Sequence, residues 1–153
     1  MSAFGHIAPR VPTLAPGSRL ALTLPELVGW GEALGRASHP PLVITVAGDL
    51  GSGKTTLAQA ICRGYGVTEA VTSPTFALVH RYDAQRSAVY HLDLYRLEGP
   101  AELTNIGWDE IVSAHALVII EWPERARGAL PAHVPIDLEH VPTDPTRRVL
   151  LAG

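Results

Sequence analysis

Hydrophobic and polar residues follow strand and helix periods in turn along most of the chain. Residues 19–23 alternate briefly, which predicts a first strand. The next segment has apolar residues at helical spacing and begins with a capping-box pattern, Thr23 followed three positions later by Glu26. A histidine and two prolines at positions 39–41 end this pattern. The sequence therefore predicts a strand followed directly by an amphipathic helix.

Two short apolar runs have the composition of buried central strands. Residues 42–47 (LVITVA) and 116–120 (ALVII) are nearly continuous and rich in β-branched side chains. The first run leads into a glycine-rich turn, and a helix is predicted from Thr56 onward. The second run ends at Glu121. A strand, a glycine loop and a helix therefore follow one another in the first half of the chain.

The other elements are a strand hairpin, a helical stretch interrupted by a glycine, and two antiparallel edge strands. In this order they are predicted at residues 75–82, 88–95, 99–113, 136–141 and 147–151. The whole pattern indicates a three-layer α/β fold with a mixed, partly antiparallel central sheet. We expect one domain over residues 19–153, preceded by a flexible tail rich in proline and glycine at residues 1–18.

Composition excludes several classes of function. The chain has 153 residues, 46% of them hydrophobic, with 12 basic and 15 acidic side chains and a net charge of −3. This balance argues against a broad basic face for DNA or for direct binding of tRNA. No apolar run has the length of a membrane span, and we see no secretory signal. Cys62 is the only cysteine, which fits a reducing cytoplasm.

Residues 48–55, GDLGSGKT, satisfy the phosphate-binding pattern G-x-x-x-x-G-K-[ST] at every fixed position. Glycines let backbone N–H groups surround an anion, and the following helix presents its positive end. Lys54 is the only lysine in a chain with 12 basic residues, and its ammonium can reach phosphate oxygens. The Thr55 hydroxyl is an oxygen ligand that suits Mg²⁺.

The alternative to a phosphate-binding loop is a glycine-rich turn without a ligand. The nucleotide-binding residues predicted here are Asp49, Leu50, Gly51, Ser52, Gly53, Lys54, Thr55 and Thr56.

Two acidic residues are candidates for the metal and the attacking water. Glu121 follows a buried strand, at the edge where open α/β sheets bind ligands. Asp93 shares a strand face with His91 and Tyr95 in the segment HLDLY. The alternatives are a surface turn for Glu121 and an exposed hairpin face for Asp93. We interpret His91 as structural, because no cluster of metal-ligating residues surrounds it.

The segment Ser73, Pro74, Thr75 and Phe76 follows the predicted phosphate-loop helix. Its hydroxyl groups could sense the γ-phosphate, as switch loops do. A simple turn that enters a strand explains the same residues equally well. Spacing alone leaves both interpretations open.

Four blocks in this order, GDLGSGKTT, SPTF, HLDLYRL and EWPE, resemble the bacterial TsaE (YjeE) ATPases. The resemblance implies a P-loop NTPase-like fold and an ATPase that uses Mg²⁺. It implies work with TsaD and TsaB counterparts in the threonylcarbamoyl modification of adenosine 37 in tRNA, which the ATPase meets only through the complex. Hydrolysis would reset that complex between turnovers.

The resemblance also implies roles for individual residues. Lys54 and Thr55 would serve phosphate and Mg²⁺, Glu121 the Mg²⁺, and Asp93 the hydrolytic step. Residues 73–76 would form the switch-like loop, and Trp122 would lie beside the nucleotide. Arg147 or its neighbour Arg148 matches an arginine near the base, with Arg147 taken first.

Two segments depart from the pattern of that family. Leu27 stands where relatives commonly have a threonine close to the adenine, and Thr23 is the alternative donor. Residues 107–111 read GWDEI where relatives commonly have G-L-x-E-Y. The first departure affects the part of the site that would contact the adenine base. The second affects a surface that could face a partner.

We therefore expect an ATPase that depends on Mg²⁺ and has Lys54, Asp93 and Glu121 as its catalytic residues. Its ATP turnover should be slow for the chain alone and stimulated by partners. A small-molecule kinase is a second hypothesis, although no long insertion is present to build an acceptor lid. A third is a docking module gated by bound nucleotide without hydrolysis. The third hypothesis uses the same residues, so sequence does not separate it from a slow ATPase.

Overall fold

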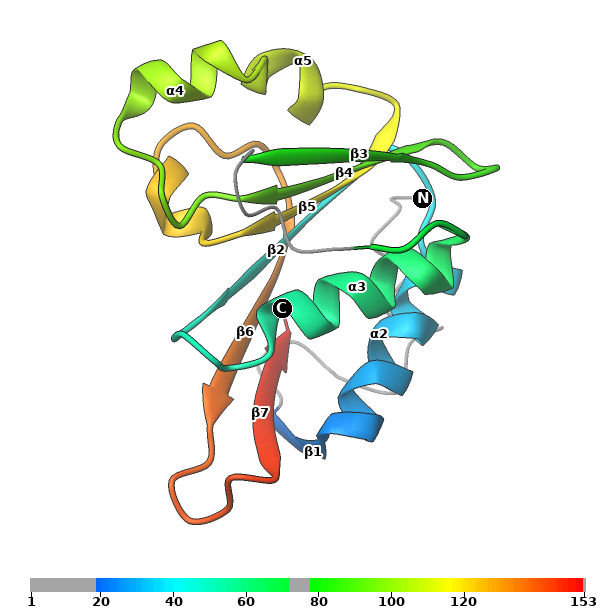
Figure 1. Cartoon of the computed structure of the whole chain (residues 1–153), viewed down its shortest axis with the longest axis vertical. Helices are drawn as coiled ribbons and strands as arrows, with labels where there is room; N and C mark the ends of the chain where they lie inside the picture. Colours follow the sequence, from blue (N-terminus) through cyan, green and yellow to red (C-terminus); the bar gives the residue numbers. More distant parts are fainter. Residues whose placement is uncertain (1–18, 72–77, 153) are drawn as a thin grey trace.

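A computed structural model describes residues 19–71 and 78–152. Within these residues seven strands form one mixed sheet in the order β1-β7-β6-β2-β5-β4-β3 (Figure 1). The strands are β1 (Arg19–Thr23), β2 (Leu42–Gly48), β3 (Val79–Asp83), β4 (Ala88–Asp93), β5 (Ala116–Glu121), β6 (Val134–His140) and β7 (Arg147–Ala152).

The centre of the sheet is parallel and its flanks are antiparallel. Strand β2 pairs in parallel with β5 and β6, and β5 pairs in parallel with β4. On the flanks, β3 runs antiparallel to β4, β7 to β6, and β1 to β7. Because β2, β4 and β5 point the same way, their carboxyl ends lie side by side at one end of the sheet. The candidate site lies at that end.

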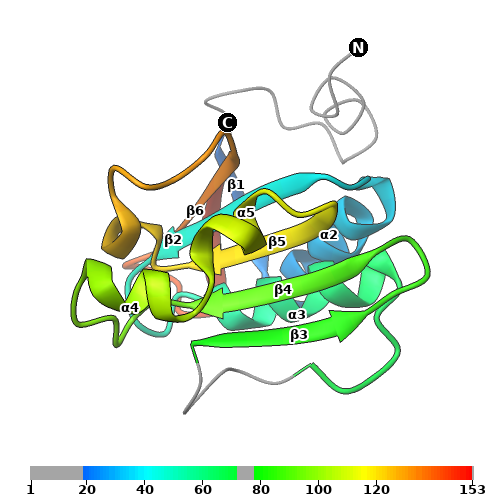
Figure 2. The same ribbon diagram turned by 90° about the horizontal axis from the view of Figure 1, so that it is seen from above.

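Helices cover both faces of the sheet, so the predicted three layers are present (Figure 2). The helices are α2 (Leu24–Ala37), α3 (Lys54–Tyr65), α4 (Pro100–Asn105) and α5 (Trp108–Val112), with a short 3₁₀ turn η1 (Pro123–Ala126). Helices α2 and α3 cover one face, and α4, α5 and η1 cover the other (Figures 1 and 2). Among the described residues, no helix combines the length and apolarity needed to span a bilayer.

Side chains of the central strands alternate between the two covering layers. In β5, Leu117 and Ile119 join the core under α2 and α3, whereas Val118 and Ile120 join the core under α4 and α5. Every residue of β5 is buried. Each fully buried aliphatic side chain contributes about 1.5–3 kcal/mol of transfer free energy. Burial on both faces explains why β2 and β5 read as continuous apolar runs.

The helix termini follow local chemistry. Thr23 caps α2: its side chain accepts a hydrogen bond from the Glu26 N–H, and the Glu26 carboxylate accepts one from the Thr23 N–H. This confirms the predicted capping box. Helix α3 ends at Gly66, whose φ of 113° is the left-handed conformation that favours glycine. Both helices that flank the site therefore have well-defined ends.

Three predictions of local structure require correction. Strands β6 and β7 are not edge strands, because β6 lies between β2 and β7, and β7 lies between β6 and β1. The edges among the described residues are β1 and β3. Helix α3 begins at Lys54, two residues before the predicted start, since the glycine loop closes at Gly53. Strand β4 ends at Asp93 rather than at residue 95.

Candidate functional site

The glycine loop connects the carboxyl end of β2 to the first turn of α3. Its glycines have positive φ angles, 152° at Gly48, 74° at Gly51 and 103° at Gly53. A Cβ atom on Gly48 would lie 2.5 Å from the Leu138 carbonyl oxygen, so a side chain does not fit there. Gly53 is the N-cap residue of α3, so no N-cap side chain accepts hydrogen bonds from the first turn of the helix. The N–H groups of the first helical turn are therefore left for an anion.

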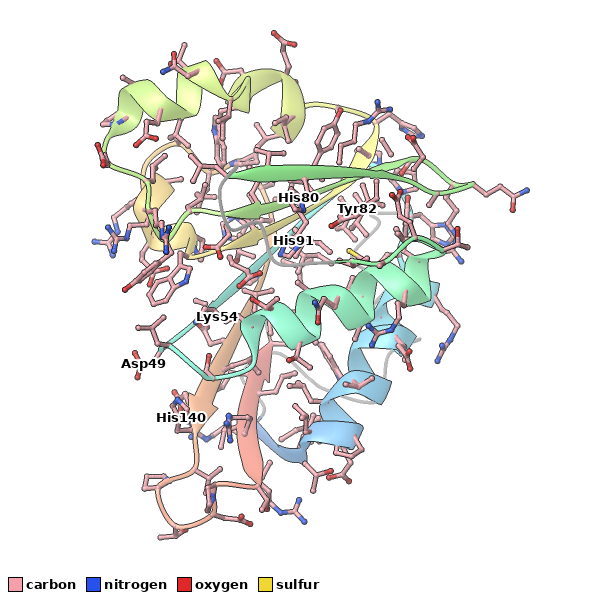
Figure 3. All side chains as sticks on the ribbon, in the orientation of Figure 1. Asp49, Lys54, His80, Tyr82, His91 and His140 are labelled. Atoms are coloured by element: carbon pink, nitrogen blue, oxygen red, sulfur yellow. The ribbon has the colours of Figure 1, made fainter. Side chains whose placement is uncertain are left out.

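Lys54 lies folded against this loop. Its Nζ donates hydrogen bonds to the carbonyl oxygens of Gly48 and Asp49, both at 2.7 Å. The same ammonium lies 4.2 Å from the ring centroid of Trp122, a cation–π distance. Burial lowers the pKa of Lys54, while Glu121 and Asp93 oppose this shift. These contacts hold the Lys54 ammonium between the glycine loop and Trp122 (Figure 3).

The two predicted carboxylates end neighbouring strands. Asp93 and Glu121 are partners in the parallel register of β4 and β5. Glu121 is 1% exposed and accepts hydrogen bonds from Thr55 Oγ1 at 2.9 and 3.2 Å. Asp93 accepts a hydrogen bond from the Tyr95 N–H at 3.0 Å. Burial raises the pKa of Asp93, the Tyr95 hydrogen bond opposes this shift, and the nearby Glu121 adds to it.

Thr55 and Glu121 fit a magnesium ion that is shared with a ligand. Both offer oxygen donors, the kind that Mg²⁺ prefers. Thr55 Oγ1 and Glu121 Oε1 are 2.9 Å apart, and adjacent ligands in an octahedral Mg²⁺ shell are about 2.9 Å apart. Among the described residues, no group of three or more His, Cys, Asp or Glu side chains could hold a metal ion. Any Mg²⁺ here would therefore need phosphate oxygens and water as further ligands.

Trp122 closes one side of the cleft. Its φ of 58° is the only positive φ of a non-glycine residue in the described part of the chain. Such a conformation costs about 1–2 kcal/mol for a bulky side chain. The indole packs against Tyr95 with ring centroids 4.8 Å apart, and the Arg125 guanidinium lies 5.7 Å from the Tyr95 ring. The left-handed turn thus aims the ring back towards Lys54.

These side chains enclose a cleft of about 320 Å³. Of the predicted residues, it is lined by Leu50, Gly51, residues 53–56, Asp93, Glu121 and Trp122. Asp49 and Ser52 do not line it: the Asp49 side chain is exposed (Figure 3), and Ser52 is fully buried beneath the loop. Residues 73–76, predicted as a switch-like loop, lie outside the described residues.

A second cleft of about 500 Å³ lies between the β1–α2 junction and the β6–β7 turn. It is lined by Thr23, Leu24, Pro25, Pro145, Thr146 and Arg148. Arg148 Nη2 donates a hydrogen bond to the Gly51 carbonyl at 3.2 Å, which connects this cleft to the loop. Arg147 instead forms ion pairs with Glu26 and Asp144, each at 3.5 Å, and does not line the cleft.

Leu27 does not reach this second cleft. It is fully buried, and its Cδ2 lies 3.3 Å from the place where a Cβ on Gly53 would be. Leu27 therefore supports the glycine loop from below, whereas Thr23 and Thr146 are the threonines that line the cleft. The alternative donor predicted from the sequence, Thr23, therefore lines this cleft.

Sequence reasoning did not predict the partner of His91. His91 is fully buried, and its Nε2 lies 2.6 Å from Glu121 Oε2. The signal was present, because His91 lies two residues before Asp93 on the same strand face. What the sequence did not show was that β4 pairs directly with β5 in this register.

The family described as "Threonylcarbamoyl adenosine biosynthesis protein TsaE" matches residues 23–149 of this chain, which is most of its length. The chain belongs to the TsaE family.

Curated TsaE relatives share substantial identity with the chain. A Treponema pallidum protein is 34% identical over 123 residues, which cover 80% of this chain and 90% of the relative. A Nostoc protein is 44% identical over 99 residues, 62% of this chain and 60% of the relative. A Bacillus subtilis protein is 37% identical over 94 residues, 61% and 58% of the two chains. All three are named tRNA threonylcarbamoyladenosine biosynthesis protein TsaE. The match to the Nostoc relative spans about three fifths of that protein's length.

A solved structure shows the same fold. The crystal structure of Bacillus subtilis YdiB superposes with a TM-score of 0.69 over 92% of this chain and 88% of that one, at 22% identity. This likeness supports the predicted P-loop NTPase-like arrangement. The family match and the curated relatives confirm the resemblance to TsaE proteins that the four sequence blocks carry.

Proposed function

We propose that this TsaE-family chain binds Mg²⁺-ATP and hydrolyses it. One observation carries the proposal: Lys54, Thr55, Asp93 and Glu121 converge in one cleft at the carboxyl ends of three parallel strands. An ammonium, a hydroxyl and two carboxylates are the groups that P-loop hydrolases use. A glycine loop alone would support binding only.

Each of these groups has a definite task in the proposed reaction. Lys54 exchanges the carbonyl oxygens of Gly48 and Asp49 for β- and γ-phosphate oxygens, where its charge offsets the charge that develops in the transition state. Thr55 and Glu121 hold Mg²⁺, the latter directly or through water. When bound, Mg²⁺ neutralises charge on the β- and γ-phosphates. Asp93 orients the attacking water.

We place the adenine in the second cleft. Its lining is mostly apolar around Leu24 and the two prolines, with the Thr23 hydroxyl as a polar group. Arg148 lines this cleft and contacts the glycine loop, whereas Arg147 is engaged in ion pairs elsewhere. Between the two arginines expected near the base, the proposal therefore assigns Arg148.

We further propose that partners complete the site. Leu50 is 64% exposed and Tyr95 39% exposed, and both line the mouth of the cleft. Large apolar side chains exposed together at a cleft are typical of interaction surfaces. The family's name places it in threonylcarbamoyladenosine biosynthesis. TsaD and TsaB counterparts are the proposed partners, in the cytoplasm, with ATP hydrolysis resetting their complex and tRNA reached only through it.

The decisive experiment is ATP turnover by the chain alone and with the TsaB and TsaD counterparts. We expect slow turnover alone, strong stimulation by the partners, and loss of both in Lys54→Ala. Arg63→Ala is the matched control, because Arg63 lies on the same helix but pairs with Glu32 at the surface. Normal turnover in Lys54→Ala would sink the assignment. Phosphate transfer to a metabolite would indicate a kinase, and nucleotide-dependent assembly without hydrolysis would indicate a docking module.

A further inference from the structure

His91 is a buried polar residue to which the proposed reaction gives no task. It lies on β4, on the face that turns towards α3 (Figure 3), with 0% of its surface exposed. Its Nε2 is 2.6 Å from Glu121 Oε2, the shortest contact that Glu121 makes with the described side chains. Its Nδ1 is buried and has no hydrogen-bond partner among the described residues. A histidine retained purely for packing would be expected to satisfy both nitrogens.

We assign the proton of the His91 ring from its contact with Glu121. An ionised carboxylate only accepts hydrogen bonds, so His91 Nε2 is assigned as the donor to Glu121. In a neutral ring Nδ1 is then an acceptor, and it is left without a donor. An apolar residue at position 91 would avoid this unpaired atom. It would also remove a hydrogen bond from a carboxylate that is 1% exposed.

Two donors therefore hold the Glu121 carboxylate from different elements. Thr55 Oγ1, from α3, lies nearer Oε1 at 2.9 Å, and His91 Nε2, from β4, contacts Oε2. With Oε2 held by the strand, Oε1 is the oxygen that faces the first turn of α3. Rotation of the carboxylate out of this plane would break a short hydrogen bond inside the protein.

We propose that His91 is a positioning residue that orients Glu121 so that Oε1 faces the magnesium ion. This inference rests on the proposed function, since it concerns the same cleft. Residues that hold a metal ligand through a hydrogen bond typically change metal affinity by about 10- to 100-fold when they are replaced. His91 acts through Glu121 and touches neither nucleotide nor metal.

The test compares variants that move the donor. In His91→Gln the amide nitrogen falls near the original Nε2 position, whereas in His91→Asn it falls near Nδ1 and cannot reach Glu121. The readout is the affinity for a fluorescent ADP analogue (mant-ADP), measured in EDTA and across a Mg²⁺ titration. We expect His91→Asn to need about 10- to 100-fold more Mg²⁺, with affinity in EDTA unchanged, and His91→Gln to remain close to the wild type.

His80→Asn is the matched control, because His80 lies opposite His91 in the β3–β4 register and does not contact Glu121. In a Glu121→Gln background, His91→Asn should cause no further change in Mg²⁺ requirement. An unchanged Mg²⁺ requirement in His91→Asn would overturn the inference. Equal weakening with and without Mg²⁺ would also overturn it, since that is the mark of a general structural defect.

A measurement on the wild-type protein keeps the test independent of folding. Long-range ¹H–¹⁵N spectra should show His91 with a proton on Nε2, and a neutral ring protonated on Nδ1 would overturn the inference. If the wild type gains no mant-ADP affinity from Mg²⁺, the proposed function fails instead. The two failures are therefore distinguishable.

Discussion

The two ends of the proposed nucleotide site are built in different ways. At the phosphate end, Lys54 and Glu121 are buried, and each is held by at least two neighbours. At the base end the lining comes from the β1–α2 junction and the β6–β7 turn, and Leu24 is 52% exposed. Buried charges tolerate little displacement, because their partners must stay within hydrogen-bond distance. The phosphate end should therefore be intolerant of substitution, and the base end more tolerant.

The largest effect of a single substitution is expected at Asp93, at the phosphate end. Asp93→Asn should lower ATP turnover by about 10²- to 10⁴-fold, the usual range for loss of a group that handles a proton or water in the transition state. Binding of Mg²⁺-ADP should stay within a few-fold of the wild type, since Asp93 is assigned to the water. Single-turnover hydrolysis and equilibrium binding measure the two effects separately.

Asp83→Asn provides the control for that substitution. Asp83 ends the neighbouring strand β3, is exposed and pairs only with Arg81 among the described residues. It should change neither turnover nor binding. A similar loss of turnover in both variants, or normal turnover in Asp93→Asn, would show that the contrast does not come from the cleft.

The second prediction concerns the helix pair that joins the two ends. Helix α2 begins at the base end and α3 at the phosphate end, and they pack closely through glycines. A Cβ on Gly35 would overlap the Ile61 carbonyl oxygen, and one on Gly64 would overlap that of Glu32. Gly35→Ala should therefore destabilise the fold by about 1–3 kcal/mol, measured by urea unfolding.

Gly29→Ala tests the same helix without the close approach. No atom lies within 4 Å of a Cβ at Gly29, so alanine should stabilise α2 by up to about 1 kcal/mol. If Gly35→Ala lowers the free energy of unfolding and Gly29→Ala raises it, close packing of α2 on α3 is supported as the link between the two ends. Equal and small effects would mean that α2 can shift away from α3 at little cost.

The difference between the two ends also explains what the sequence could predict. The residues of the phosphate end are close in sequence or end apolar strands, so the glycine loop, Asp93 and Glu121 were all predicted. Thr23 and Arg148 are brought together only by the pairing of β1 with β7, in which Leu22 opposes Arg148. No local pattern reports that pairing. The same missing information led to β6 and β7 being predicted as edge strands.

His91 shows the same limit at the scale of one side chain. Its strand face was predicted correctly, because period-two alternation depends only on neighbouring residues. Its partner was not, because the register of β4 against β5 depends on packing between segments that are far apart in the sequence. Side-chain chemistry is thus predictable where it is local, and partners across strands are not.

The third prediction separates the two arginines of the base end. Arg148→Ala should weaken ATP binding by about 5- to 10-fold, roughly the value of one hydrogen bond near the nucleotide. Arg147→Ala should change affinity by less than twofold, since its partners are Glu26, Asp144 and the Ala21 carbonyl. Titration calorimetry with ATP distinguishes the variants. A larger loss in Arg147→Ala would reverse the assignment made here.

The smallest effect is expected from the cap of α2, where the base end meets the fold. Thr23→Ala should cost about 1 kcal/mol, the usual value of an N-cap side chain. Hydrogen bonding by the Thr23 N–H, and then by the Thr23 side chain, lowers the pKa of Glu26 below its ordinary value of 4.5. Because the pKa of Glu26 is lower in the folded state than in the unfolded state, the ionised carboxylate stabilises the fold above pH 4.5. This contribution is lost as the pH falls through the folded pKa.

Glu26→Gln separates charge from hydrogen bonding at this cap, because the amide oxygen can still accept from the Thr23 N–H. We expect the wild type to lose more stability than Glu26→Gln when the pH is lowered from 6 to 3, in urea unfolding at each pH. Since Arg147 also pairs with Glu26, Arg147→Ala should weaken the pH dependence only slightly, as the Arg147 charge is the smallest cause of the pKa shift. Identical acid profiles for the wild type and Glu26→Gln would show that the charge of this carboxylate does not contribute to the stability of the α2 cap.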